Sequence, residues 1–125
     1  MFNWWRKVTE PETQIPNIID LEVPLRMELA ILFKHSPKCP VSLVAYREVV
    51  HFRKQFPAIP VFLISVREER ALAVAISERT GIAHASPQIL VLQKGFVQSV
   101  LSHDQITADD IGDVVASQPQ TEANA

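Results

Sequence analysis

The chain has 125 residues, of which 47% are hydrophobic and 21% are charged, and its formal net charge is −2. This length fits a single domain that can bury a core without disulfides or a structural metal. No basic stripe of the kind that binds nucleic acid stands out. The single cysteine, Cys39, excludes an internal disulfide and a cysteine-rich zinc site.

The first residues lack the features of a targeting segment. Trp4 and Trp5 are followed by Arg6 and Lys7, without a long apolar region or a small-residue cleavage site. The longest apolar runs are far shorter than a membrane span. Together with the lone cysteine, these features predict a reducing, cytoplasmic setting and neither nucleic-acid nor membrane partners.

The N-terminal part is predicted to be partly irregular. Pro11 and Pro16 interrupt it, because proline removes a backbone donor and restricts the preceding residue. Pro24 could open a short helix. The expected organisation is an N-terminal segment at residues 1–28, a core at 29–116 and a disordered tail at 117–125.

From residue 29 onward, apolar runs that suit buried strands alternate with apolar residues at helical spacing. The expected elements are a strand at 29–33, a loop at 34–38, a helix from Pro40 that ends before Pro57, a strand at 61–64, a helix at 68–79 closed by Gly81, strands at 89–92 and 96–101 joined by a turn at Lys94-Gly95, and a helix capped by Thr107. The two helix-linked strands should be parallel, and the hairpin should add two antiparallel strands. The pattern predicts an α/β fold with a mixed central sheet and helices on both faces.

The segment Lys38-Cys39-Pro40-Val41-Ser42 carries the most chemistry. Proline is favoured at the first helical position, so Pro40 makes Cys39 the N-cap and places Ser42 at N3. A thiolate at the N-cap faces unpaired backbone N–H groups and the positive end of the helix dipole, which stabilise the charged form. Lys38 could add to this effect, and the Ser42 hydroxyl could donate a hydrogen bond to the sulfur.

Two interpretations of this cysteine compete. A lone cysteine is usually a buried and inert thiol. The position of Cys39 between a buried strand and Pro40 favours a reactive thiol, because ligands meet open α/β sheets where a strand ends and a helix begins. Ser86-Pro87 precedes another apolar strand, and its peptide bond could be cis, although only about 5–6% of such bonds are.

The histidines leave further alternatives open. His35 lies four residues before Cys39, where it could tune the thiol or contact a substrate, or could sit exposed at a strand end. His84 and His103 could approach the same edge of the sheet, but they are expected at the surface or as capping residues. His51 is expected to be solvated within a helix. No metal site is expected from this set, since closely spaced ligands are missing.

The segment Phe33-Lys34-His35-Ser36-Pro37-Lys38-Cys39-Pro40-Val41-Ser42 resembles the thioredoxin superfamily and, more closely, the bacillithiol-system redox-active YtxJ family of monothiol bacilliredoxins. Further matches are Glu78-Arg79-Thr80-Gly81-Ile82, His84, Ser86-Pro87-Gln88, Ser102-His103 and Ile106-Thr107. The resemblance covers about residues 29–116. The chain departs from the family at its N-terminal segment, where prolines interrupt the family's first helix.

The resemblance implies a thioredoxin-like fold and a monothiol oxidoreductase. Cys39 would match the nucleophile, and Ser42 would replace the resolving cysteine of a dithiol thioredoxin. Pro87 would match the cis-proline beside the sulfur, and the Ser86 backbone would pair with the bound thiol adduct. The implied reaction removes bacillithiol, or a similar low-molecular-weight thiol, from S-thiolated client proteins, with that thiol as co-substrate and no bound cofactor.

The chemistry of a single thiol agrees with this implication. Thiol–disulfide exchange passes through a mixed disulfide, which a dithiol enzyme resolves with its own second cysteine. This chain has no second cysteine, so an external thiol must regenerate it. A non-enzymatic binding module or redox sensor stays open as the alternative, in which the groove beside Pro87 would hold a peptide by strand addition.

Overall fold

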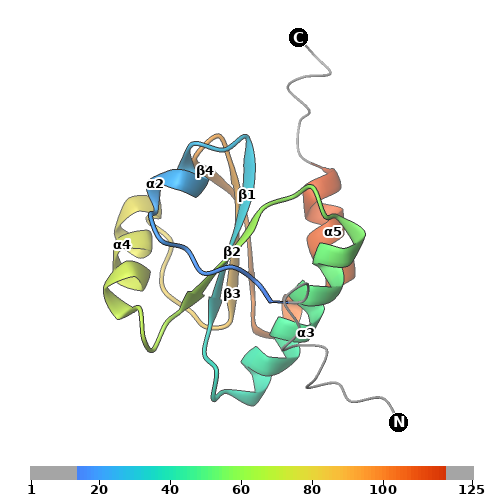
Figure 1. The fold of residues 1–125 in the computed structure, drawn as a ribbon, viewed down its shortest axis with the longest axis horizontal. Helices are drawn as coiled ribbons and strands as arrows, with labels where there is room; N and C mark the ends of the chain where they lie inside the picture. The colour runs from blue at the N-terminus through green and yellow to red at the C-terminus, as the bar shows by residue number, and fades with distance from the viewer. Residues whose placement is uncertain (1–13, 118–125) are drawn as a thin grey trace.

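A four-stranded mixed sheet lies at the centre of the computed structural model, which describes residues 14–117 (Figure 1). Its strands are β1 (Leu29–His35), β2 (Val61–Ser65), β3 (Gln88–Gln93) and β4 (Phe96–Ser102), in the order β2-β1-β3-β4. β1 pairs in parallel with β2 and antiparallel with β3, and β3 pairs antiparallel with β4. This confirms the predicted mixed sheet with a hairpin.

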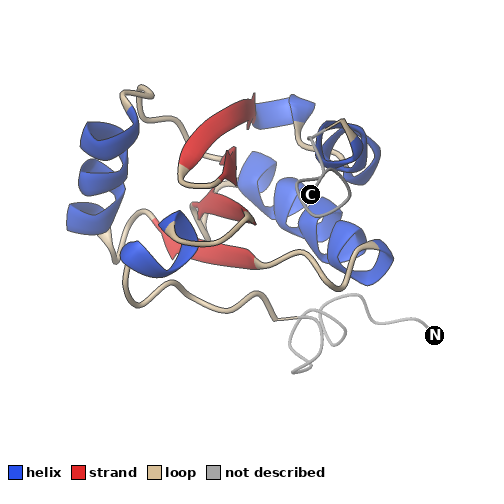
Figure 2. Cartoon of the chain, turned by 90° about the horizontal axis from the view of Figure 1, so that it is seen from above, coloured by secondary structure: helices blue, strands red, loops and turns tan. Residues whose placement is uncertain are grey.

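The described helices are α2 (Glu22–Leu25), α3 (Pro40–Gln55), α4 (Arg70–Thr80), the 3-10 helix η2 (His103–Gln105) and α5 (Ala108–Ala116). α3 and α5 lie on one face of the sheet and α4 lies on the other (Figures 1 and 2). α5 begins as predicted, because the Thr107 hydroxyl accepts a hydrogen bond from the Asp110 N–H at 3.0 Å. None of the helices within residues 14–117 is long and apolar enough to cross a membrane.

β1 is buried on both faces, which explains its unbroken apolar run. Ile31 and Phe33 belong to the core beneath α3 and α5, whereas Leu32 belongs to the core beneath α4. The sequence predicts that this strand ends at Phe33. In the structure it continues through Lys34 and His35. Both residues stay in the strand because they are paired: Lys34 with Ile64 and Gln88, and His35 with Ser65.

Two glycines, one at the end of α4 and one in the turn between β3 and β4, have a left-handed backbone conformation. Gly81, at φ +74°, closes α4, and Gly95, at φ +83°, follows Lys94 in the turn between β3 and β4. A Cβ on Gly95 would lie 2.7 Å from the backbone oxygen of Leu25, whereas nothing lies within 4 Å of a Cβ on Gly81. Helix α4 starts at Arg70 rather than at the predicted Glu68.

Within the described residues, the chain from Pro16 to Ile18 lies along β2. Asn17 forms a parallel bridge with Leu63, flanked by hydrogen bonds of 3.0 Å from Ile18 N–H to the Leu63 oxygen and 2.8 Å from Leu63 N–H to the Pro16 oxygen. Pro24 lies inside the short helix α2 rather than at its first position. Trp4, Trp5, Pro11 and residues 118–125 of the predicted tail at 117–125 lie outside the described residues, and Ser117 is the C-cap of α5.

Candidate active site

Cys39 is the N-cap of α3, and Pro40 occupies the first helical position, as the proline pattern predicts. The backbone of Cys39 is extended, at φ −94° and ψ 122°, and its side chain is partly exposed. Its N–H donates to the Ser36 carbonyl at 3.0 Å, and its carbonyl accepts from the Leu43 N–H at 3.0 Å. Cys39 is therefore a partly exposed residue at the start of a sixteen-residue helix.

Ser42 does not direct its hydroxyl at the sulfur. Its Oγ accepts a hydrogen bond from the Ser36 N–H at 2.9 Å and lies 2.8 Å from Nδ1 of His35. The prediction that this hydroxyl donates to the Cys39 sulfur is wrong, because the end of β1 provides both partners. Ser42 is fully buried and fastens the first turn of α3 to that strand end.

His35 is buried, so the alternative of an exposed histidine at a strand end is wrong. It is 6% exposed, and its ring centroid lies 5.4 Å from that of Phe33 and 5.1 Å from that of Tyr46. Burial lowers the pKa of His35 to about 4, although a hydrogen bond to Ser42 acts in the opposite direction. The imidazole is therefore neutral at pH 7, and it meets the site through Ser42.

The Ser86-Pro87 peptide bond is cis, and Pro87 is buried. Ser86 Oγ lies 2.7 Å from Ser36 Oγ, and the Pro87 carbonyl accepts from the His103 N–H at 3.0 Å. Since the Cys39 N–H also bonds to Ser36, the structure places the Ser86-Pro87 segment against the loop that presents the cysteine.

The remaining candidates lie at the surface. Lys38 is exposed in the turn directly before Cys39. His51 and His103 are exposed, as expected. His84 is also exposed, but its Nδ1 lies 3.4 Å from Nζ of Lys34, a contact the sequence did not suggest.

The burial of Lys34 was not predicted from the sequence. It is 0% exposed although it carries an amine, and it faces the α4 side of the sheet, opposite to His35. Burial lowers the pKa of Lys34, and burial together with the positive charge of Lys34 lowers the pKa of His84. The signal available in the sequence was the unbroken apolar run leading into Lys34.

Within residues 14–117 no group of three or more histidine, cysteine, aspartate or glutamate side chains is placed to hold a metal ion. What the elements bring to one edge of the sheet is a single thiol, a helix N-terminus and a cis peptide segment. A family model described as monothiol bacilliredoxin BrxC matches residues 12–111. The chain belongs to the monothiol bacilliredoxin family.

Solved structures show the same fold for this bacilliredoxin. A protein described as a candidate oxidoreductase with a thioredoxin fold is 22% identical over 81% of this chain and 93% of its own, with a TM-score of 0.75. Mitochondrial thioredoxin 3 from Saccharomyces cerevisiae is 10% identical, covering 86% of this chain and 98% of its own at a TM-score of 0.68. A mutant thioredoxin from Halobacterium salinarum is 16% identical, covering 90% of this chain and 96% of its own at a TM-score of 0.68. The bacilliredoxin is thus a thiol redox protein with a thioredoxin-like fold.

Proposed function

We propose that this bacilliredoxin removes bacillithiol, or a similar low-molecular-weight thiol, from the cysteines of client proteins through a mixed disulfide on Cys39. One observation carries the proposal. A partly exposed thiol caps a helix, and a serine occupies the position three residues later, where a dithiol enzyme has its resolving cysteine. The family match supports this assignment.

The proposed reaction is two successive thiol–disulfide exchanges. The Cys39 thiolate attacks the small-thiol sulfur of a client's mixed disulfide. That disulfide bond breaks, a new one joins Cys39 to the small thiol, and the client leaves as a thiolate that takes a proton from solvent. A second small thiol, reacting as its thiolate, then attacks the adduct, which releases the Cys39 thiolate and an oxidised dimer of the small thiol.

Each candidate residue has a place in this scheme. Cys39, at the N-terminus of α3 whose start is fixed by Pro40, is the proposed nucleophile, and Lys38 lies directly before it. The backbone of Ser86, beside the buried Pro87, is proposed to pair with the bound adduct.

Two further residues govern what the adduct can do next. Ser42 keeps a polar group in the resolving position but cannot form a disulfide, so the adduct persists until a second thiol arrives. His35 holds Ser42 in place from beneath. Because that second thiol must be supplied reduced, the scheme requires a reducing compartment such as the cytoplasm.

The test follows the mass of the intact protein. Exposure to oxidised bacillithiol should add one bacillithiol to the wild-type chain, and reduced bacillithiol should then remove it. The Cys39→Ser variant should form no adduct and should fail to release bacillithiol from a bacillithiolated client protein. A Cys39→Ser protein that still reduces the client would contradict the proposal, and a wild-type protein that forms no adduct would favour a binding module.

A further inference from the structure

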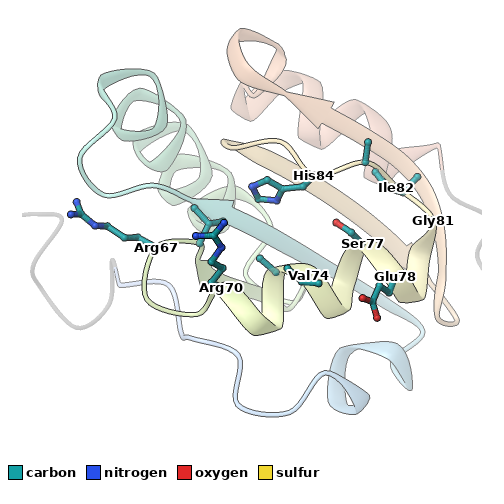
Figure 3. A pocket seen from close by; sticks show the side chains of 11 residues that line it. Arg67, Arg70, Val74, Ser77, Glu78, Gly81, Ile82 and His84 are labelled. Carbon is teal, nitrogen blue, oxygen red and sulfur yellow. The ribbon is translucent and has the colours of Figure 1, made fainter.

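A cavity of about 690 Å³ lies on the α4 side of the sheet (Figure 3). It is lined by the segment that follows β2, by one face of α4 and by the loop from Gly81 to His84. A volume of this order is typical of sites for small molecules. None of the residues that line it has a role in the reaction proposed above.

His84, in the wall of this cavity, is linked to Cys39 through Ser86 and Ser36. His84 lines the cavity and precedes Ser86 by two residues, a span of at most about 7 Å along the chain. Ser86 Oγ lies 2.7 Å from Ser36 Oγ, and the Ser36 carbonyl accepts from the Cys39 N–H at 3.0 Å. A small molecule attached to the sulfur could therefore pass over Ser86 and enter the cavity.

The end of the cavity nearest α4's first turn is positively charged. Arg67 and Arg70 line it, and within residues 14–117 neither arginine forms a salt bridge. Arg70 and His84 point into the cavity from opposite walls, whereas Arg67 points away (Figure 3). The acidic lining residue, Glu78, lies further along α4, toward its C-terminal end.

The buried Lys34 contacts His84 and adds positive charge on this side of the cavity. Its Nζ lies 3.4 Å from Nδ1 of His84, and within the described range no carboxylate is paired with it. When the ammonium donates to Nδ1, the proton of the neutral imidazole must sit on Nε2. His84 then offers an N–H donor to a ligand, with a positive charge behind it.

We propose that this cavity binds the carboxylate-bearing part of the small thiol whose sulfur is joined to Cys39, with a carboxylate held between Arg70 and His84. This inference rests on the proposed function and adds to it the location and charge of the small-thiol site. Ala73, Val74 and Ile82 supply apolar lining for the carbon skeleton. Guanidinium groups bind carboxylates with two parallel hydrogen bonds, which suits Arg70.

The test compares two disulfides with the same protein. Oxidised bacillithiol carries carboxylates, and bis(2-hydroxyethyl) disulfide carries none. For each variant, the rate at which Cys39 gains the adduct is measured with both reagents, and the rate with oxidised bacillithiol is divided by the rate with the neutral disulfide. This ratio cancels general effects on the reactivity of the thiol.

Arg70→Gln should lower this ratio about tenfold, which corresponds to the loss of roughly 1.4 kcal/mol of binding in the transition state. Arg70→Lys should recover part of it, because the charge remains while the two-pronged geometry is lost. Val74→Asp, which adds a negative charge at a half-exposed lining position, should lower the ratio by an independent route. Arg26→Gln is the matched control, since Arg26 is exposed at the end of α2, before β1 begins, and should leave the ratio unchanged.

Three results would overturn the inference, and they separate a failure of the cavity assignment from a failure of the proposed function. If Arg70→Gln and Val74→Asp both form the adduct at an unchanged ratio, the cavity does not hold the small thiol, while the proposed function stands. The same conclusion follows if Arg70→Gln alters only the release of bacillithiol from clients with acidic residues near their cysteine, because the cavity then holds a client side chain. If the wild-type protein reacts with neither disulfide, the proposed function fails and the cavity assignment fails with it.

Discussion

Nδ1 of His35 and Oγ of Ser42 lie 2.8 Å apart in the buried layer beneath the first turn of α3. The pair joins the end of β1 to the helix that carries Cys39 without either side chain bonding to the sulfur. The Ser42 hydroxyl also accepts a hydrogen bond from the Ser36 N–H, so it contacts the loop between the strand and the helix as well as the strand end. Changes at either residue should therefore reach the thiol indirectly.

The first prediction concerns the pH dependence of stability. The pKa of His35 is lowered from 6.5 to about 4 by burial, so the folded protein binds fewer protons than the unfolded chain between these values. The stability contributed by neutral His35 is complete above pH 6.5 and is lost as the pH falls toward 4. Lowering the pH from 7 to 5 should cost on the order of 1–2 kcal/mol through this residue, as measured by urea unfolding.

A pair of histidine variants isolates this effect. His35→Gln removes the titrating group, so its free energy of unfolding should fall less between pH 7 and pH 5 than that of the wild type. His51→Gln removes an exposed histidine within α3 and should leave the wild-type pH dependence unchanged. An equal fall in wild type and His35→Gln would refute a role for His35.

The second prediction compares two buried serine hydroxyls. Ser42→Ala leaves the Ser36 N–H and the His35 ring without their partner and should destabilise the protein by about 1–3 kcal/mol. Ser77→Ala removes a buried hydroxyl that has no hydrogen-bond partner within the described residues, so it should be neutral or slightly stabilising. Thermal unfolding of the two variants measures the difference, and similar losses in both would argue against the Ser42 network.

The third prediction converts the site from one thiol to two. Ser42→Cys places a second sulfur at the third helical position, one turn from the Cys39 N-cap. A bacillithiol adduct on Cys39 should then be expelled without added thiol, as the two sulfurs close an internal disulfide. Intact mass spectrometry would show the adduct replaced by a species two hydrogens lighter than the reduced chain.

The control for this conversion is Ser117→Cys, which adds an exposed thiol at the far end of α5. That variant should keep its bacillithiol adduct until a reduced thiol is supplied. Persistence of the adduct in Ser42→Cys would mean that the geometry of the first turn does not allow the two sulfurs to meet.

The fourth prediction separates two glycines that share a left-handed backbone. Gly81→Ala should cost about 1–2 kcal/mol, because the strain of the positive φ acts alone where nothing lies within 4 Å of the new Cβ. Gly95→Ala should cost more, since its Cβ would lie 2.7 Å from the Leu25 oxygen, a backbone atom that cannot swing aside. Equal losses in the two variants, measured by chemical unfolding, would show that α2 moves freely away from the hairpin turn.

Local chemistry made much of the fold predictable. Proline at position 40 marked the start of α3, the Thr107 hydroxyl marked the start of α5, and apolar runs marked the strands. The end of β1 was not predictable in the same way, since Lys34 and His35 are polar and stay in the strand only because partners lie on neighbouring strands. The length of β1 is therefore determined by its pairing with neighbouring strands.

The candidate site also combines features that local sequence predicts with contacts that it does not predict. The N-cap position of Cys39 follows from its immediate neighbours, so the sequence predicted it. The partner of Ser42 is seven residues away, and the contact between Lys34 and His84 spans 50 residues, so no local pattern could reveal either. The cavity beside α4 lies between the segment after β2, α4 and the loop that ends at His84, so local sequence did not predict it either.

The 2.7 Å contact between Ser36 and Ser86 also spans 50 residues, and it has a consequence for the newly made protein. A ribosome delivers Cys39 well before it delivers Ser86 and Pro87. Until β3 has emerged and paired with β1, the cysteine lacks the segment proposed to hold its adduct. Binding of an adduct at this site is therefore expected only after the hairpin has been synthesised and β3 has paired with β1.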